Sequence, residues 1–108
     1  MIVTVYHHDI RNPEALEAVA AVEAGTLETL QALEFAWERT QNLNGSWSRG
    51  PRHADGSRNA DYHPAIRVLR PLHVENGEVY GLRSSMMGDV FELGGKRYRV
   101  ATIGFDEL

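Results

Sequence analysis

The chain has 108 residues, of which 43% are hydrophobic and 24% charged, and this suits one folded domain over residues 1–108. It contains no cysteine, which excludes disulfides, thiol catalysis and thiolate metal sites. No apolar run approaches the roughly 18 residues that a membrane-spanning helix needs, and no signal-peptide pattern is present. We therefore expect a cytoplasmic protein without a membrane partner.

The net charge is −4 with histidine neutral, and the acidic excess lies in residues 1–50. Residues 51–108 contain equal numbers of acidic and basic side chains. A surface that binds nucleic acid neutralises phosphates with Lys and Arg. The charge balance therefore disfavours a nucleic-acid partner.

The first predicted element in chain order is a strand, because residues 2–7 are dense in β-branched and aromatic types. Asn12-Pro13 is typical of a helix start, and apolar residues follow on one helical face. The stretch 18–23 equally suits a short strand that ends at Gly25. Both interpretations stay open for this segment.

The principal helix is predicted over residues 26–43. Thr26 is a suitable N-cap, and Asn44-Gly45 supplies a stop signal. Its apolar stripe consists of Leu30, Leu33, Ala36, Trp37, Thr40 and Leu43. The opposite side is acidic and is expected to steer a partner through Glu28, which falls in the first turn, Glu34 and Glu38.

Phe35 falls among the polar residues of this helix. Two interpretations stay open: either a loop or second sheet covers the ring, or the ring anchors a partner.

Residues 44–64 are predicted to form one long loop, because Gly, Ser, Asn, Asp and Pro dominate and no periodicity is present. The loop contains an aromatic and arginine mixture typical of contact surfaces: Trp47, Arg49, Arg52, Arg58 and Tyr62. The alternative is that Trp47 and Tyr62 attach the loop to the core. Phe35, Trp47, Arg49, Arg52 and Tyr62 are the predicted partner contacts.

The remaining sequence predicts an antiparallel sheet. Residues 66–69 form a half-buried strand, and Asn76-Gly77 closes a hairpin over 74–79. Gly94-Gly95 closes a second hairpin, in whose register Glu92 faces Arg97 and Phe91 faces Tyr98.

No motif in the sequence predicts an enzyme, a metal site or a cofactor. His7 and His8 are neighbours on a strand, so they point to opposite faces and are interpreted as solvent-facing. No strand–Gly-x-Ser-x-Gly–helix elbow accompanies the serines, and Gly94-Gly95 precedes no helix that would cradle a phosphate. We predict no catalytic residue.

The segment Arg83–Asp89 has two interpretations. In the first it is a tight turn in which Gly88 supplies an unusual backbone angle and Asp89 bonds nearby amides. In the second, Met86 and Met87 form an adaptable contact surface.

The C-terminal third resembles YodL-like and related small domains in three stretches, Arg83-Ser-Ser-Met-Met-Gly-Asp-Val, Gly95-Lys-Arg-Tyr-Arg-Val and Ile103-Gly-Phe-Asp-Glu-Leu. Residues 33–42 with Gly45-Ser-Trp47 resemble the helix that precedes this tail, whereas Met86-Met87 depart from the family pattern. Phages, plasmids and conjugative elements encode such domains, often beside antirestriction genes. The resemblance implies a strand before the helix and carries no catalytic residues.

The sequence therefore predicts an α+β domain, in which a mainly antiparallel sheet packs one face against the helix. The leading hypothesis is a phage- or mobile-element-encoded accessory protein in the cytoplasm of a bacterial host. It would bind a host protein, a bacterial defence component, and inhibit it by surface blocking, as an inhibitor of the anti-CRISPR or antirestriction type.

The alternative is a nucleic-acid-associated module of element transfer or regulation that uses Arg67, Arg70, Arg97, Arg99 and Tyr80. A hydrolase is a third hypothesis. The oligomeric state is not predicted.

Overall fold

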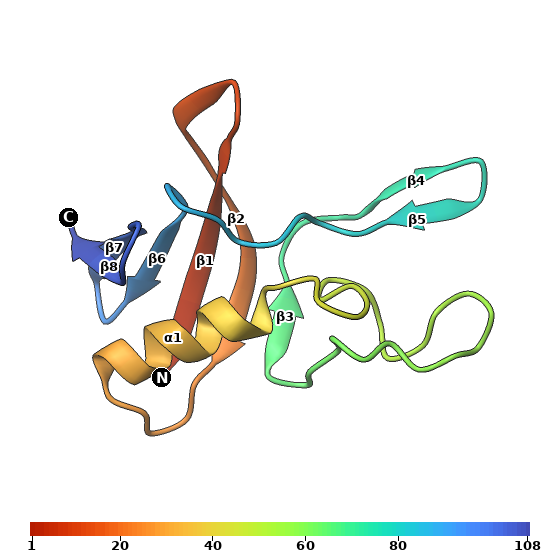
Figure 1. Ribbon diagram of the computed structural model, residues 1–108, viewed down its shortest axis with the longest axis horizontal. Helices are drawn as coiled ribbons and strands as arrows, with labels where there is room; N and C mark the ends of the chain where they lie inside the picture. The colour runs from red at the N-terminus through yellow and green to blue at the C-terminus, as the bar shows by residue number, and fades with distance from the viewer.

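The computed structural model describes residues 1–108 and contains a six-stranded sheet, one helix and a separate two-stranded hairpin (Figure 1). Every strand pair is antiparallel, and the order across the large sheet is β3-β2-β1-β6-β7-β8. The elements are β1 (Ile2–Asp9), β2 (Asn12–Glu23), α1 (Thr29–Arg39), β3 (Ile66–Val68), β4 (His73–Glu75), β5 (Glu78–Tyr80), β6 (Val90–Leu93), β7 (Lys96–Val100) and β8 (Phe105–Glu107). The predicted α+β class is confirmed.

The segment after Asn12 is a strand, so the predicted helix start at Asn12-Pro13 is wrong, whereas the strand interpretation of 18–23 is correct. β2 pairs with β1 from Ile2↔Glu23 to Asp9↔Asn12, with irregular register at two places. In this long pairing the backbone N–H and C=O groups of β2 bond to β1, and the periodicity of the sequence alone does not reveal those partners.

The predicted helix is confirmed, but α1 is shorter than residues 26–43. Its N-cap is Glu28 rather than Thr26, and no side chain caps this end. It ends at Arg39, and the C-cap is Thr40, whose hydroxyl donates to the Ala36 carbonyl at 2.8 Å. Leu43 is 76% exposed and does not belong to the apolar stripe.

α1 lies across one face of the large sheet (Figure 1), and the hydrophobic core fills the space between them. The helix contributes Ala32, Leu33 and Ala36. The strands contribute Val3, Val5, Val19, Ala20, Val22, Phe91, Leu93 and Val100. The single helix has only 11 residues and is neither long nor apolar enough to cross a membrane.

Both predicted hairpin turns are confirmed. At the tip of the β4–β5 hairpin Asn76 has φ 52° and Gly77 φ 80°, the left-handed pair that a two-residue turn of this type requires. Glu92 faces Arg97 across β6 and β7, and the Arg97 Nε atom lies 3.0 Å from the Glu92 carboxylate. β4 and β5 stand apart from the large sheet and project away from it (Figure 1).

Candidate functional site

Loop 44–64 contains no helix or strand, as predicted, but side chains within it hold its backbone firmly. The Asp61 carboxylate accepts hydrogen bonds from the amides of Leu43, Asn44 and Gly45 at 2.8, 2.9 and 2.7 Å. The buried Asn59 side chain donates to the carbonyls of two other loop residues, Ser46 and Gly50. These bonds fix the direction in which the loop leaves α1.

Trp47 is a core residue, so its predicted role as a partner contact is wrong. Its side chain is 1% exposed, and its Nε1–H donates to the Arg83 carbonyl at 2.9 Å. The ring also meets the edge of the His7 ring. Trp47 therefore attaches the loop to the sheet, which is the alternative that the sequence left open.

Phe35 is also covered rather than free. Its ring is half-buried against the core, meets His63 of the loop edge-on and lies 5.5 Å from the Arg39 guanidinium. Of the two interpretations of this residue, the covered one is correct.

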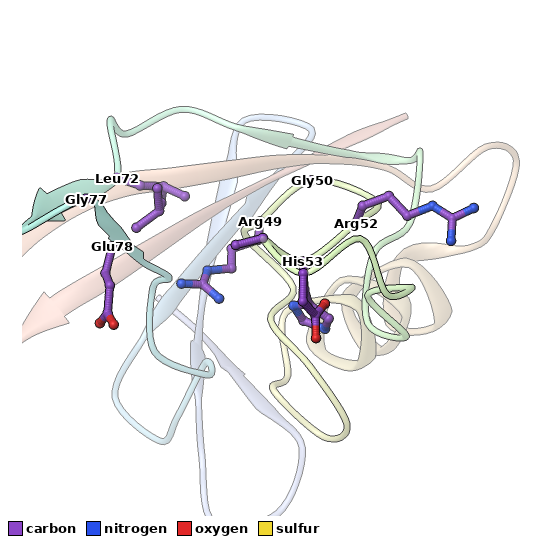
Figure 2. Close-up of a pocket in the computed structure, with 10 residues that line it drawn as sticks. Arg49, Gly50, Arg52, His53, Leu72, Gly77 and Glu78 are labelled. Atoms are coloured by element: carbon purple, nitrogen blue, oxygen red, sulfur yellow. The ribbon is translucent and has the colours of Figure 1, made fainter.

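Loop 44–64 and the β4–β5 hairpin project from the same end of the molecule (Figure 1) and enclose a cleft of about 670 Å³. We call this the loop–hairpin cleft, and it is lined by Arg49, Arg52, His53, Leu72, Glu78 and Val79 among others. In Figure 2 the Arg49 side chain extends toward the hairpin, whereas that of Arg52 extends away from it. Of the predicted contacts, only Arg49 and Arg52 line this cleft.

The arginines of the loop lack acidic partners. Arg52 and Arg58 face each other in an isolated antiparallel bridge and are both exposed. Neither they nor Arg49 lies within ion-pair distance of a carboxylate. Like charges directly opposite each other destabilise a strand pair, so an external anionic group would relieve this repulsion.

The hairpin that forms the other wall is exposed along its whole length. Val74, Val79 and Tyr80 are 59%, 38% and 47% exposed, although β-branched and aromatic side chains usually pack against a neighbour. Tyr62, which is 41% exposed, does not line the cleft. The hairpin therefore presents apolar side chains beside the unpaired arginines.

The predicted acidic face lies elsewhere. Glu28, Glu34 and Glu38 are exposed along α1 and do not line the loop–hairpin cleft. Glu34 borders a groove next to Trp37.

Three of the arginines named for the nucleic-acid alternative share the sheet face opposite α1. Register places Arg67 next to Ala21, Arg97 next to Glu92 and Arg99 next to Asp106 on this face. Arg70 lies outside the strands and pairs with Glu17 at 3.0 Å, and Tyr80 belongs to the separate hairpin. The predicted set is therefore not assembled as one surface.

A buried charge cluster lies at the other end of β1, and sequence reasoning missed it. Asp89 is fully buried, and its Oδ1 atom lies 2.7 Å from His8 Nδ1 and accepts from His8 N at 2.9 Å. Both terminal nitrogens of Arg83 donate to the Asp89 carboxylate, at 2.7 and 2.8 Å. Burial raises the pKa of Asp89, but the bonds from Arg83, His8 and Met86 outweigh it and hold that pKa below the ordinary value.

The prediction that both histidines face solvent is wrong, because His7 is buried and the His8 side chain is only 10% exposed. The His7 ring is buried, and burial lowers its pKa to about 4 against the opposing attraction of Asp89. His7 Nε2 lies 3.1 Å from Ser85 Oγ, which lies 2.7 Å from Thr40 Oγ1. Because the Thr40 hydroxyl donates to a helix carbonyl, the Ser85 hydroxyl donates to Thr40. Ser85 then accepts from His7, so the neutral His7 ring carries its proton on Nε2.

The turn interpretation of Arg83–Asp89 is confirmed. Gly88 has φ 94°, and Asp89 accepts from the Met86 amide at 2.8 Å. Met86 and Met87 are exposed, at 40% and 58%, beside this turn. The sequence of this segment indicated that Asp89 bonds within its own turn. Nothing in the sequence near Asp89 indicates that His8 of β1 is its other partner.

No three side chains of His, Asp or Glu come together in a way that would hold a metal ion. Comparisons with protein-family models, curated proteins and solved structures found no match to this chain.

Proposed function

We propose that this chain is an accessory protein of a phage or mobile element that binds a host protein and blocks it through the loop–hairpin cleft. The observation that carries the proposal is the exposed β4–β5 hairpin beside arginines without ion-pair partners. An isolated two-stranded hairpin is marginally stable in water, so a partner that covers its side chains would stabilise it.

The chemistry of the cleft supports a protein partner with an acidic surface. Val79 lines the cleft and Tyr80 follows it on the hairpin, and both offer apolar area. Arg49 extends from the loop toward the hairpin, whereas Arg52 and its bridge neighbour Arg58 offer guanidinium groups to carboxylates on the adjoining outer surface of the loop. Aromatic residues and arginine are enriched at the centres of protein interfaces, where arginine binds carboxylates bidentately. The exposed Glu28, Glu34 and Glu38 of α1 would favour one orientation of approach.

The finer identity of the target comes from the resemblance to YodL-like domains. Genes for such domains often accompany antirestriction genes, so a CRISPR effector or a restriction complex is the proposed target. The bacterial cytoplasm is then the proposed location.

A plating assay tests this proposal. The chain is expressed in bacteria that carry a CRISPR or restriction system, and the plating efficiency of a restricted phage is measured. We expect at least a tenfold gain with the wild-type chain and the loss of this gain with Arg52→Glu/Arg58→Glu. The matched control, Arg67→Glu/Arg99→Glu, reverses two charges on the open sheet face and is expected to keep the gain.

The nucleic-acid module stays as the second candidate, because Arg67, Arg97 and Arg99 share that open face. Its signature is salt-dependent retention on single- or double-stranded DNA that Arg67→Glu/Arg99→Glu abolishes. If the control variant loses the plating gain and DNA retention together, the sheet face is the binding surface and the cleft proposal is wrong. If no defence system tested is relieved by the wild-type chain, the inhibitor proposal is wrong for those systems.

A further inference from the structure

A second cavity, of about 760 Å³, is lined by residues of the β1–β2 hairpin and of the segment between β5 and β6. His8, Arg11, Glu17, Arg70 and Arg83 are among the residues that line it. It shares no lining residue with the loop–hairpin cleft, so an inference about it does not depend on the proposed function.

The Asp89 carboxylate determines which nitrogen of His8 carries the proton. Asp89 Oδ1 is 2.7 Å from Nδ1, and an ionised carboxylate only accepts hydrogen bonds, so Nδ1 is the donor. In neutral His8 the other nitrogen, Nε2, then presents a lone pair. Nε2 has no hydrogen-bond partner in the protein, and the His8 side chain is 10% exposed and lines the cavity. His8 therefore offers a hydrogen-bond acceptor to the cavity.

The orientation of this ring is fixed on several sides. Arg83 donates to both Asp89 oxygens and to the His8 carbonyl, the latter at 3.0 Å. Gly88 has φ 94°, and a Cβ atom at this position would lie 3.1 Å from His8 Cε1. The turn thus packs closely against the ring, and the acceptor is held in place before any ligand arrives.

The cavity also contains cations that are available to an anion. Arg11 has no ion-pair partner, whereas Arg70 bridges to Glu17 at 3.0 Å while remaining 51% exposed. The third arginine, Arg83, is committed to Asp89. Arg11 and Arg70 are therefore the groups that would bind an anion there, with the carboxylates of Asp9 and Glu17 disfavouring high negative charge.

We propose that this cavity binds a small anion that also carries a hydroxyl, such as a phosphate with one protonated oxygen or a phosphorylated polyol that keeps a free hydroxyl. The hydroxyl donates to His8 Nε2, and the anionic oxygens accept from Arg11 and Arg70. An anion without a hydroxyl leaves the His8 acceptor without a partner. The site therefore selects for the proton donor as well as for charge.

Inorganic phosphate and sulfate provide a matched pair of probes, because at pH 8 hydrogen phosphate carries one O–H group and sulfate carries none. Isothermal titration of the whole chain with each anion, at equal ionic strength, measures the selectivity. We expect phosphate to bind about tenfold more tightly, the difference that one net hydrogen bond makes. His8→Ala is expected to remove this preference and leave sulfate binding unchanged, whereas His73→Ala, an exposed histidine of the hairpin, keeps it.

Long-range proton–nitrogen NMR spectra of wild-type protein test the same idea without a variant. In the free protein at pH 8 we expect His8 to be protonated at Nδ1 and unprotonated at Nε2, with the Nε2 resonance moving when phosphate is added. Equal binding of phosphate and sulfate, binding of neither, or a proton on Nε2 at pH 8 would each overturn the proposal. Arg52→Glu/Arg58→Glu should leave phosphate binding intact, which separates this site from the cleft.

Discussion

At the residue scale, the Asp89 carboxylate connects β1 to the turn that precedes β6. It accepts from the His8 amide, 81 residues earlier in the chain, and from the Met86 amide of its own turn. The Arg83 guanidinium completes the charge balance at 2.7 Å. A buried carboxylate with this many donors is stable only as long as the donors stay in place, because an unpaired buried charge is costly.

His7 makes the stability of the fold sensitive to acid. Burial lowers its pKa to about 4, below the ordinary value of 6.5, so the unfolded chain binds the proton more readily than the folded one. The stability that the fold gains from keeping His7 neutral is fully present above pH 6.5 and is lost as the pH falls through about 4. We expect the free energy of unfolding, measured with urea, to fall by roughly 3 kcal/mol over this range.

A variant identifies the histidine responsible for this acid sensitivity. His7→Gln keeps a donor for Ser85 and should flatten the dependence between pH 6.5 and pH 4, whereas the exposed His73→Gln should leave it unchanged. A slope that survives His7→Gln would show that another group carries the titration. Protonation of Asp89 lowers the unfolding free energy further, but only at more acidic pH, because the pKa of Asp89 lies below its ordinary value.

Trp47 and Tyr62 look alike in the sequence but should differ sharply in their effect on stability. Trp47→Ala removes a ring that is 1% exposed, and a loss of about 3–5 kcal/mol in unfolding free energy is expected. Tyr62→Ala removes a side chain that is 41% exposed and should cost less than about 1 kcal/mol. Urea titrations followed by circular dichroism measure both. If Trp47→Ala does not fold, Trp47→Phe should fold with an intermediate loss, and equal effects of the alanine variants would contradict the assignment.

At the element scale, local signals predicted the turns better than the helix ends. Asn76-Gly77 and Gly94-Gly95 carry their backbone requirement in the residues themselves, and both turns formed as expected. The chain leaves the helix after Arg39, and the amides of Leu43, Asn44 and Gly45 donate to the Asp61 carboxylate, from 16 to 18 residues away, instead of to helix carbonyls. No periodicity within 26–43 contains that information.

The β4–β5 hairpin should be removable without unfolding the rest of the chain. His73 and Tyr80 are paired neighbours, so a short Gly-Gly linker between Leu72 and Gly81 spans the gap. Because all six strand residues are exposed, we expect the unfolding free energy to change by less than about 1 kcal/mol. Urea titration measures this, and the plating gain should be lost in the same variant. A loss above about 2 kcal/mol would show that the hairpin packs on the body of the protein.

At the scale of the whole molecule, the sequence predicted the α+β class and most strands but not their order. The large sheet joins its two halves through β1 and β6, whose pair Thr4↔Glu92 is separated by most of the chain. The charge cluster of His8, Arg83 and Asp89 forms across this same junction. The sequence indicated the turn at Arg83–Asp89 but not that His8 of β1 lies against it, so the candidate ligand cavity was not predictable before the strands were placed side by side.

The β1–β6 junction also sets a condition on biosynthesis. β1 is synthesised before β6 and occupies an inner position of the sheet, and β6 arrives only after residue 93 has been made. Until then the nascent chain carries one unpaired edge of β1 and an incomplete core, the kind of exposed strand that associates with other chains. Cells that translate this message slowly should therefore need a chaperone to shield that edge.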